Sequence, residues 1–103
     1  MIFQITTKLD KLVTLDERRY EHILDHVEMK NQIERIKETL REPEEIRESI
    51  YDNSVWLFYK FYSKTPVTKK YMLVVVKVLN NKGFIITAFY TDEIKKGELV
   101  WKS

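Results

Sequence analysis

The sequence contains no cysteine. A chain without thiols forms no disulfide, binds no metal through thiolate and offers no cysteine nucleophile. This absence fits a protein of the reducing cytoplasm, which is the location we expect. Glycine is also scarce, because the chain has only Gly83 and Gly97. A glycine-rich loop that cradles phosphate is therefore excluded.

Long apolar runs are missing as well. A membrane-spanning helix needs roughly 18 consecutive apolar residues. The longest apolar run, residues 71–76, has only the length of a strand. Residues 1–5 lack the basic-then-apolar layout of a signal peptide. The sequence therefore predicts no association with a membrane.

The residues that are present suit one small globular domain. The 103 residues are 44% hydrophobic and 33% charged, which predicts a single domain over residues 1–103 with one core. Charge is unevenly distributed, with a net charge of −4 for residues 1–54 and +6 for residues 55–103. A basic half attracts polyanions such as RNA. Lysines that keep strands soluble are the alternative explanation.

The first half of the chain has helical periodicity. Residues 2–7 alternate loosely and suit a short strand. Thr14 and Glu17 fit a capping box, which predicts a helix over residues 15–30. Its buried stripe would be Tyr20, Ile23, Leu24 and Val27. A second helical segment is expected over residues 31–41, carried by Ile33, Ile36 and Leu40, and ending before Pro43.

The second half has strand periodicity. Strands are expected over residues 55–62, 70–79 and 84–91, with a short last strand over residues 99–101. The strand of residues 70–79 is apolar on both faces and should lie centrally. These patterns predict an α+β fold, with N-terminal helices packed on one face of a three- to four-stranded antiparallel sheet.

Both histidines of the chain, His22 and His26, fall off the predicted buried stripe, and Arg19 lies on the flank of the same helix. A histidine suits general acid–base catalysis near neutral pH. The i, i+4 spacing would also let both imidazoles bind one metal ion, but the HExxH signature is absent and no third ligand is evident. Two exposed histidines without a role are the alternative. No metal site and no cofactor are predicted.

Other candidates carry phosphate-binding groups. Arg47 could clamp a phosphate in bidentate fashion or pair with nearby glutamates. Thr87 and Tyr90 could hydrogen-bond a phosphate, although strand alternation places them on opposite faces unless a bulge intervenes. Trp56, Phe58, Lys60 and Tyr62 form a row that either stacks bases or packs beneath the helices.

Read in order, several segments resemble a known set of nuclease domains. They are Arg19, His22, Ile23, His26 and Glu28, then Pro43, Ile46 and Ser49, then residues 71–77, then residues 86–90. The chain resembles the small phage-associated nuclease domains of the barnase–EndoU–colicin–RelE superfamily. Members of that superfamily are typically metal-independent ribonucleases, often toxins or phage-encoded effectors, with N-terminal helices and a four-stranded antiparallel sheet.

The resemblance implies a role for each candidate residue. His22 and His26 would act as acid and base, Arg47 would bind phosphate, and Thr87 with Tyr90 would line the site. Arg19, Lys60 and Lys77 would bind substrate. The first hypothesis is therefore a cytoplasmic ribonuclease that has RNA as its partner. An inhibitor or immunity protein is the second partner that the resemblance implies. The rival hypothesis is a module that binds RNA or protein without cleaving it. In the structure, an enzyme needs a histidine, Arg47 and a sheet hydroxyl around one cleft.

Overall fold

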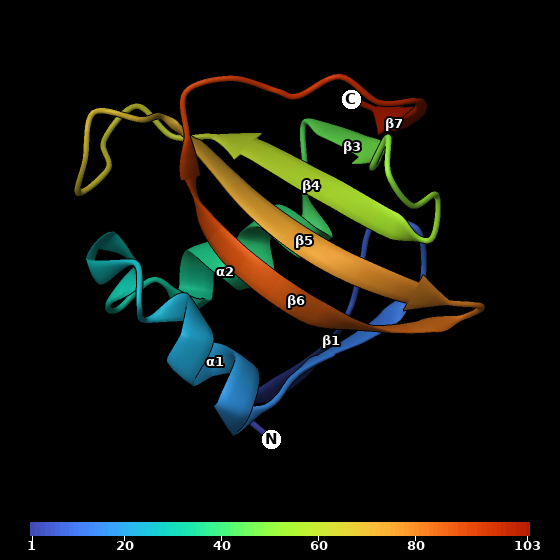
Figure 1. The fold of residues 1–103 in the computed structure, drawn as a ribbon, viewed down its shortest axis with the longest axis horizontal. Helices are drawn as coiled ribbons and strands as arrows, with labels where there is room; N and C mark the ends of the chain where they lie inside the picture. Colours follow the sequence, from blue (N-terminus) through green and yellow to red (C-terminus); the bar gives the residue numbers. More distant parts are fainter.

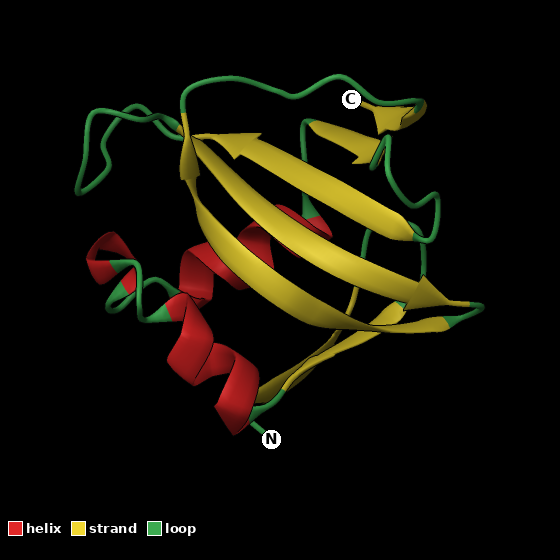
Figure 2. Cartoon of the chain, in the orientation of Figure 1, coloured by secondary structure: helices red, strands yellow, loops and turns green.

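A curved seven-stranded sheet organises the molecule, as Figures 1 and 2 show for the computed structural model, which describes all residues 1–103. In chain order the elements are β1 (Phe3–Thr6), β2 (Leu12–Leu15), α1 (Glu17–Ile23), the 3₁₀ turn η1 (Val27–Met29), α2 (Ile33–Arg41), β3 (Glu45–Glu48), β4 (Val55–Phe61), β5 (Tyr71–Leu79), β6 (Lys82–Thr91) and β7 (Leu99–Lys102). The strand order is β1-β2-β6-β5-β4-β3-β7. Neighbouring strands run antiparallel except β2 and β6, which pair in parallel.

The sheet curls around α2. The amine of Lys8, in the turn between β1 and β2, lies 5.4 Å from the ring centre of Trp101 in β7. Because β1 and β7 are the two edge strands, this contact brings opposite ends of the sheet together. The amide of Lys8 also donates to the carbonyl of Leu40 at the end of α2, with an N–O distance of 3.0 Å.

The inner face of the sheet, which the helices cover, holds the main core. Ile36 and Leu40 of α2 are fully buried against it, as is Ile23 of α1. Burying such a side chain contributes about 1.5–3 kcal/mol. Met29 of η1 also belongs to this core. The strands supply the rest of it through Phe3, Ile5, Val13, Leu15, Ile46, Phe58, Met72, Val74, Val76, Ile85, Ala88 and Tyr90.

The outer face is covered over part of its width by a strap, residues 92–98, that connects β6 to β7. Ile94 of the strap packs on Leu57, Tyr59 and Leu73, which are buried. The amide of Lys95 donates to the Tyr59 hydroxyl at 3.1 Å. Burial raises the pKa of the Tyr59 hydroxyl. No helix crosses the outer face of β4, β5 and β6, which is turned toward the viewer in Figure 1.

A β-bulge interrupts the pairing of β5 with β6. Val75 faces Thr87 and Val76 faces Ile85, so Ile86 is an extra residue in β6. Strict alternation would place Phe84 and Phe89 on opposite faces of the sheet. The extra residue puts both of them on the outer face, because Phe84 faces Lys77 and Phe89 faces Leu73.

The predicted fold class is wrong. The molecule is mostly sheet, with seven strands of mixed direction and only two short helices, instead of helices on three or four antiparallel strands. The cause lies at the two ends of the sheet. Residues 3–15 form a hairpin that joins β6, and β3 and β7 extend the opposite end. Local periodicity reports strands but carries no information on which distant strands pair.

The predicted first helix is too long. Asp16 is its N-cap and not Thr14, since Thr14 belongs to β2 and the Asp16 carboxylate accepts the Arg19 amide at 2.8 Å. The helix ends at Ile23, so Leu24 is 37% exposed and Val27 is 85% exposed, against the prediction that both are buried. Met29 of η1 enters the core in their place.

Other sequence-based expectations are confirmed. The second helix and the strands of the second half lie within a few residues of their predicted bounds, and β5 is the middle strand of the sheet. Ile36 and Leu40 are buried as predicted. Neither helix is long and apolar enough to cross a membrane.

Candidate functional site

Two of the predicted site residues meet on α1. His22 and Arg19 line an open hollow of about 470 Å³ together with Asp16 and Arg18. We call this the arginine hollow. The His22 side chain is 66% exposed, and its Nδ1 atom lies 3.8 Å from the Asp25 carboxylate. The hollow therefore combines a titratable imidazole with two guanidinium groups. Sequence reasoning named His22 and Arg19 but missed Arg18.

His26 does not share the face of His22, because α1 ends between them. The backbone of His26 is extended and begins η1. Its ring stacks on Phe89 of β6, with ring centroids 5.3 Å apart and an angle of 30° between the planes. The i, i+4 arrangement considered for a shared metal ion needs one continuous helix, and no group of three or more metal-binding side chains gathers anywhere.

Arg47 is in the sheet, far from His22 on α1 and from His26 at the start of η1. It belongs to β3, and β4 and β5 separate it from β6. Its Nε atom pairs with the Glu45 carboxylate at 2.7 Å, and its Nη1 atom donates to the carbonyl of Gly97 at 2.9 Å. The structure thus has the glutamate pair that the sequence offered as the alternative to a phosphate clamp. Arg47 ties the strap to β3.

Thr87 and Tyr90 point to opposite faces of the sheet, as alternation predicts. Thr87 is half-buried on the outer face opposite Val75. Tyr90 is 1% exposed on the inner face, and its hydroxyl donates to the Gln32 side chain and accepts from Arg35 at 3.1 Å. Burial raises the pKa of the Tyr90 hydroxyl. The two hydroxyls do not line one site.

Lys60 and Lys77 have protein partners. The Lys60 amine donates to the carbonyl of Glu42, the C-cap of α2, at 2.8 Å. The row that contains Lys60 packs beneath the helices, because Phe58 is fully buried and Trp56 and Tyr62 contact the core. Lys77 lies on the outer face and pairs with Asp52 at 3.1 Å.

The open aromatic surface is therefore on the face that sequence analysis did not single out. We define the aromatic strip as Phe61, Tyr71, Phe84 and Phe89 on the outer face. Phe61 is 46% exposed and meets Tyr71 edge-on, with ring centroids 5.6 Å apart. Tyr71, Phe84 and Phe89 are half-buried.

Nitrogen-bearing side chains flank the aromatic strip. The Arg19 guanidinium lies 5.3 Å from the ring centre of Phe84, and the His26 ring stacks on Phe89. α1 and η1 run beside the part of β6 that β2 leaves unpaired, so they place these two side chains along one border. On the other side, Lys95 and Lys96 of the strap line a small hollow with Leu57. Only the bulge at Ile86, which no sequence pattern marked, aligns Phe84 with Phe89.

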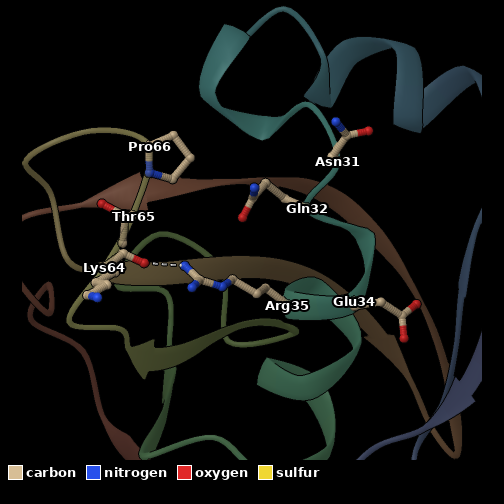
Figure 3. A pocket seen from close by; sticks show the side chains of 7 residues that line it. All are labelled: Asn31, Gln32, Glu34, Arg35, Lys64, Thr65 and Pro66. Atoms are coloured by element: carbon tan, nitrogen blue, oxygen red, sulfur yellow. Dashed lines mark hydrogen bonds between the residues drawn. The ribbon is translucent and has the colours of Figure 1, made fainter.

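A second polar site lies at the start of α2. Figure 3 shows this Arg35 pocket, an open depression of about 330 Å³ with no hydrophobic residue in its lining, formed by Asn31, Gln32, Glu34, Arg35, Lys64, Thr65 and Pro66. The Arg35 Nη1 atom donates to the carbonyl of Lys64 at 2.7 Å. The guanidinium lies 4.2 Å from the ring centre of Tyr62. Sequence analysis did not identify Arg35, which looked like an ordinary charged helix residue.

Comparison with protein families, with curated proteins and with solved structures gave no match to this chain. The aromatic strip, the arginine hollow and the Arg35 pocket are therefore the features from which a function can be inferred.

Proposed function

We propose that the protein binds single-stranded RNA on the aromatic strip. The observation that supports this proposal is the open outer face, where Phe61, Tyr71, Phe84 and Phe89 lie between cations on two borders. A base stacked on an aromatic side chain contributes about 1–3 kcal/mol. Unpaired bases are needed for such stacking, because bases inside a duplex already stack on each other.

The charge distribution favours a polyanion as the partner. Residues 55–103, which supply the strip and the strap, carry a net charge of +6. Arg19, Lys95 and Lys96 form no ion pair with an acidic side chain, so they are available to phosphates. Binding in the cytoplasm, the compartment expected for a chain without cysteine, belongs to the same proposal.

Alanine substitution on the strip tests the proposal. We expect Phe61→Ala and Tyr71→Ala each to weaken the binding of a fluorescent oligouridine by about tenfold or more, since each removes a stacking surface. Leu99→Ala is the control, because Leu99 is 47% exposed on the edge strand β7 and lies off the strip. Equal affinities for all three variants and the parent protein would refute binding on the strip.

A second candidate function is metal-independent cleavage of RNA at the arginine hollow. The observation that favours it is the position of His22 beside Arg18 and Arg19, at the border where Arg19 also covers Phe84. The neutral imidazole would take the 2′-hydroxyl proton, and the 2′-oxygen would attack the adjacent phosphorus. The 5′-oxygen would leave with a proton from an acidic group, giving a 2′,3′-cyclic phosphate.

In this second candidate the two arginines stabilise the charge that develops on the phosphate. Its basis in the sequence is the order of motifs, which resembles that of the barnase–EndoU–colicin–RelE nucleases. An inhibitor protein that covers the hollow belongs to the same proposal. Arg47, tied to Glu45 and Gly97, takes no part. The mechanism requires no cofactor.

Incubation with RNA in EDTA tests the second candidate. We expect cleavage by the parent protein, loss of cleavage in His22→Ala and retained cleavage in Arg47→Gln. Because His22 is exposed, its loss should leave the melting temperature nearly unchanged. Intact RNA after incubation with the parent protein would reject cleavage while leaving the binding proposal standing.

A further inference from the structure

We infer that the Arg35 pocket binds a phosphate monoester, such as the terminal phosphate of an RNA strand or free phosphate. This inference rests on the proposed RNA binding only for the first of these two sources. The aromatic strip would bind the bases of the RNA, whereas the pocket would bind the phosphate at one end of the RNA strand. The two sites are formed by different side chains and can be tested separately.

The cations of the pocket have no acidic partner. Neither Arg35 nor Lys64 forms an ion pair. Glu34 also lines the pocket, but its carboxylate lies 3.3 Å from the Lys37 amine, and it points away from Arg35 in Figure 3. Two positive charges therefore remain for a ligand, which matches the charge of a phosphate monoester near neutral pH.

The Arg35 guanidinium is held in place before any ligand arrives. Only its Nη1 atom has hydrogen-bond partners, the Lys64 carbonyl at 2.7 Å and the Tyr90 hydroxyl at 3.1 Å. The Tyr62 ring packs against one side of the guanidinium, with 4.2 Å between the Arg35 Cζ atom and the ring centre. Its other donors are free to bind phosphate oxygens, and a fixed guanidinium loses little freedom on binding.

The lining limits the ligand to a small polar group. None of its seven residues is hydrophobic, whereas sites for bases and other organic ligands are mostly apolar. Figure 3 shows Gln32 and Arg35 turned toward the loop of Lys64, Thr65 and Pro66. Asn31 is a further polar residue of the lining.

The pocket lies at the end of the sheet where the strip has most of its rings. Residues 62–70, which include Lys64, connect the strands that carry Phe61 and Tyr71. Phe89 and Tyr90 are consecutive in β6, the first facing the strip and the second bonded to Arg35. An RNA strand whose bases stack on the aromatic strip would therefore have one of its ends near Arg35.

The test is to measure the binding of two kinds of ligand to the full chain. The first is inorganic phosphate, titrated into labelled protein at constant ionic strength while backbone amide signals are followed by NMR. The second is a set of oligouridines with a 5′-phosphate, a 3′-phosphate or hydroxyls at both ends, measured by fluorescence anisotropy. The variants are Lys64→Ala and Arg35→Gln. The control is Lys69→Ala, which removes an exposed lysine of the same loop that does not line the pocket.

We expect one phosphorylated end to bind about tenfold tighter than the hydroxyl form, as one or two charge-assisted hydrogen bonds would give. Lys64→Ala and Arg35→Gln should remove that advantage and leave the binding of the hydroxyl oligonucleotide unaffected, and Lys69→Ala should retain the advantage.

The other outcomes separate the two sources of phosphate. If phosphate shifts the amide signals of residues 31–35 but the strand end has no effect, free phosphate is the ligand. If neither ligand acts on these residues while the hydroxyl oligonucleotide binds, the inference is overturned and RNA binding stands. If phosphate binds but no oligonucleotide does, RNA binding fails and the pocket stands.

Discussion

The hydrogen-bond partners of individual side chains separate the candidate residues of this protein. Arg47, Lys60 and Lys77 each have a fixed partner within the fold. His22 and Arg19 instead face an open hollow. A sequence reveals which side chains can bind phosphate, but only the structure reveals which of them are already engaged.

Asp52 gives a prediction about ionisation. Its Oδ1 atom accepts from the Ser54 hydroxyl at 2.6 Å and from the Ser54 amide at 2.9 Å. These bonds, with a smaller contribution from Lys77, lower the pKa of Asp52 from 3.8 to about 2. An NMR titration of the carboxyl carbon should show this midpoint. Ser54→Ala should raise the pKa more than Lys77→Met does, and an equal or reversed order would contradict the assignment.

The stability that Asp52 contributes has a definite pH dependence. A lowered pKa means that folding favours the ionised carboxylate. The contribution is therefore complete above the ordinary pKa of 3.8 and is lost as the pH falls toward about 2. A change of pH near neutrality therefore leaves the contribution of Asp52 to stability unchanged.

A substitution at Tyr90 distinguishes a structural role of its hydroxyl from a catalytic one. Tyr90→Phe removes the hydroxyl that joins Gln32 to Arg35 in the interior. We expect a loss of about 1 kcal/mol in the free energy of unfolding, measured by urea denaturation. Cleavage of RNA, if present, should continue in this variant. A stable variant without cleavage would restore Tyr90 to the catalytic group that the sequence suggested.

At the scale of elements, some parts of the chain could be predicted and others could not. β4, β5 and β6 follow from alternation, because each is long and bounded by turn residues such as Asn80 and Asn81. The end of α1 could not be predicted, because Leu24 and Val27 continue the helical pattern after the helix has stopped. The bulge at Ile86 was also hidden, although it decides which face Phe84 occupies.

The early end of α1 predicts different costs for two adjacent residues. Ile23 is fully buried and Leu24 is 37% exposed. Ile23→Ala should lower the free energy of unfolding by about 2–5 kcal/mol, the usual cost of emptying a core position. Leu24→Ala should cost less than about 1 kcal/mol, because much of the side chain already contacts water. Chemical denaturation of both variants under one set of conditions makes the comparison, and a larger loss for Leu24→Ala would contradict the helix boundary.

For the whole molecule, the candidate site depends on how distant segments meet. Arg19 and His26 reach the strip because α1 and η1 occupy the edge of β6 that β2 leaves free. Lys95 and Lys96 lie on the β4 side of the outer face because the strap packs there, with Ile94 on Leu57 and Tyr59. The sequence indicated His26 and Arg19 individually. Their aromatic partners depend on long-range pairing, which periodicity within one segment does not record.

The distribution of cations around the strip predicts a strong effect of salt on RNA binding. For single strands, log K falls with log salt by about 0.7 for each phosphate neutralised. Four contacts, from Arg18, Arg19, Lys95 and Lys96, would weaken binding about 50-fold between 50 and 200 mM salt. Anisotropy titrations at several salt concentrations give the slope. Lys95→Ala should reduce it by about 0.7, and an unchanged slope would place the RNA elsewhere.

The parallel pairing of β2 with β6 bears on how the chain folds during synthesis. Besides its pairing with β1, β2 needs a second partner, and this partner is the distant segment Lys82, Gly83 and Phe84. Pairings between such distant segments form slowly, since a long loop must close first. On the ribosome, the first hairpin would leave the exit tunnel long before β6 is made. Val13 and Leu15, fully buried in the finished protein, would stay exposed through that interval. The nascent chain is therefore most open to aggregation or chaperone binding until its last long strand appears.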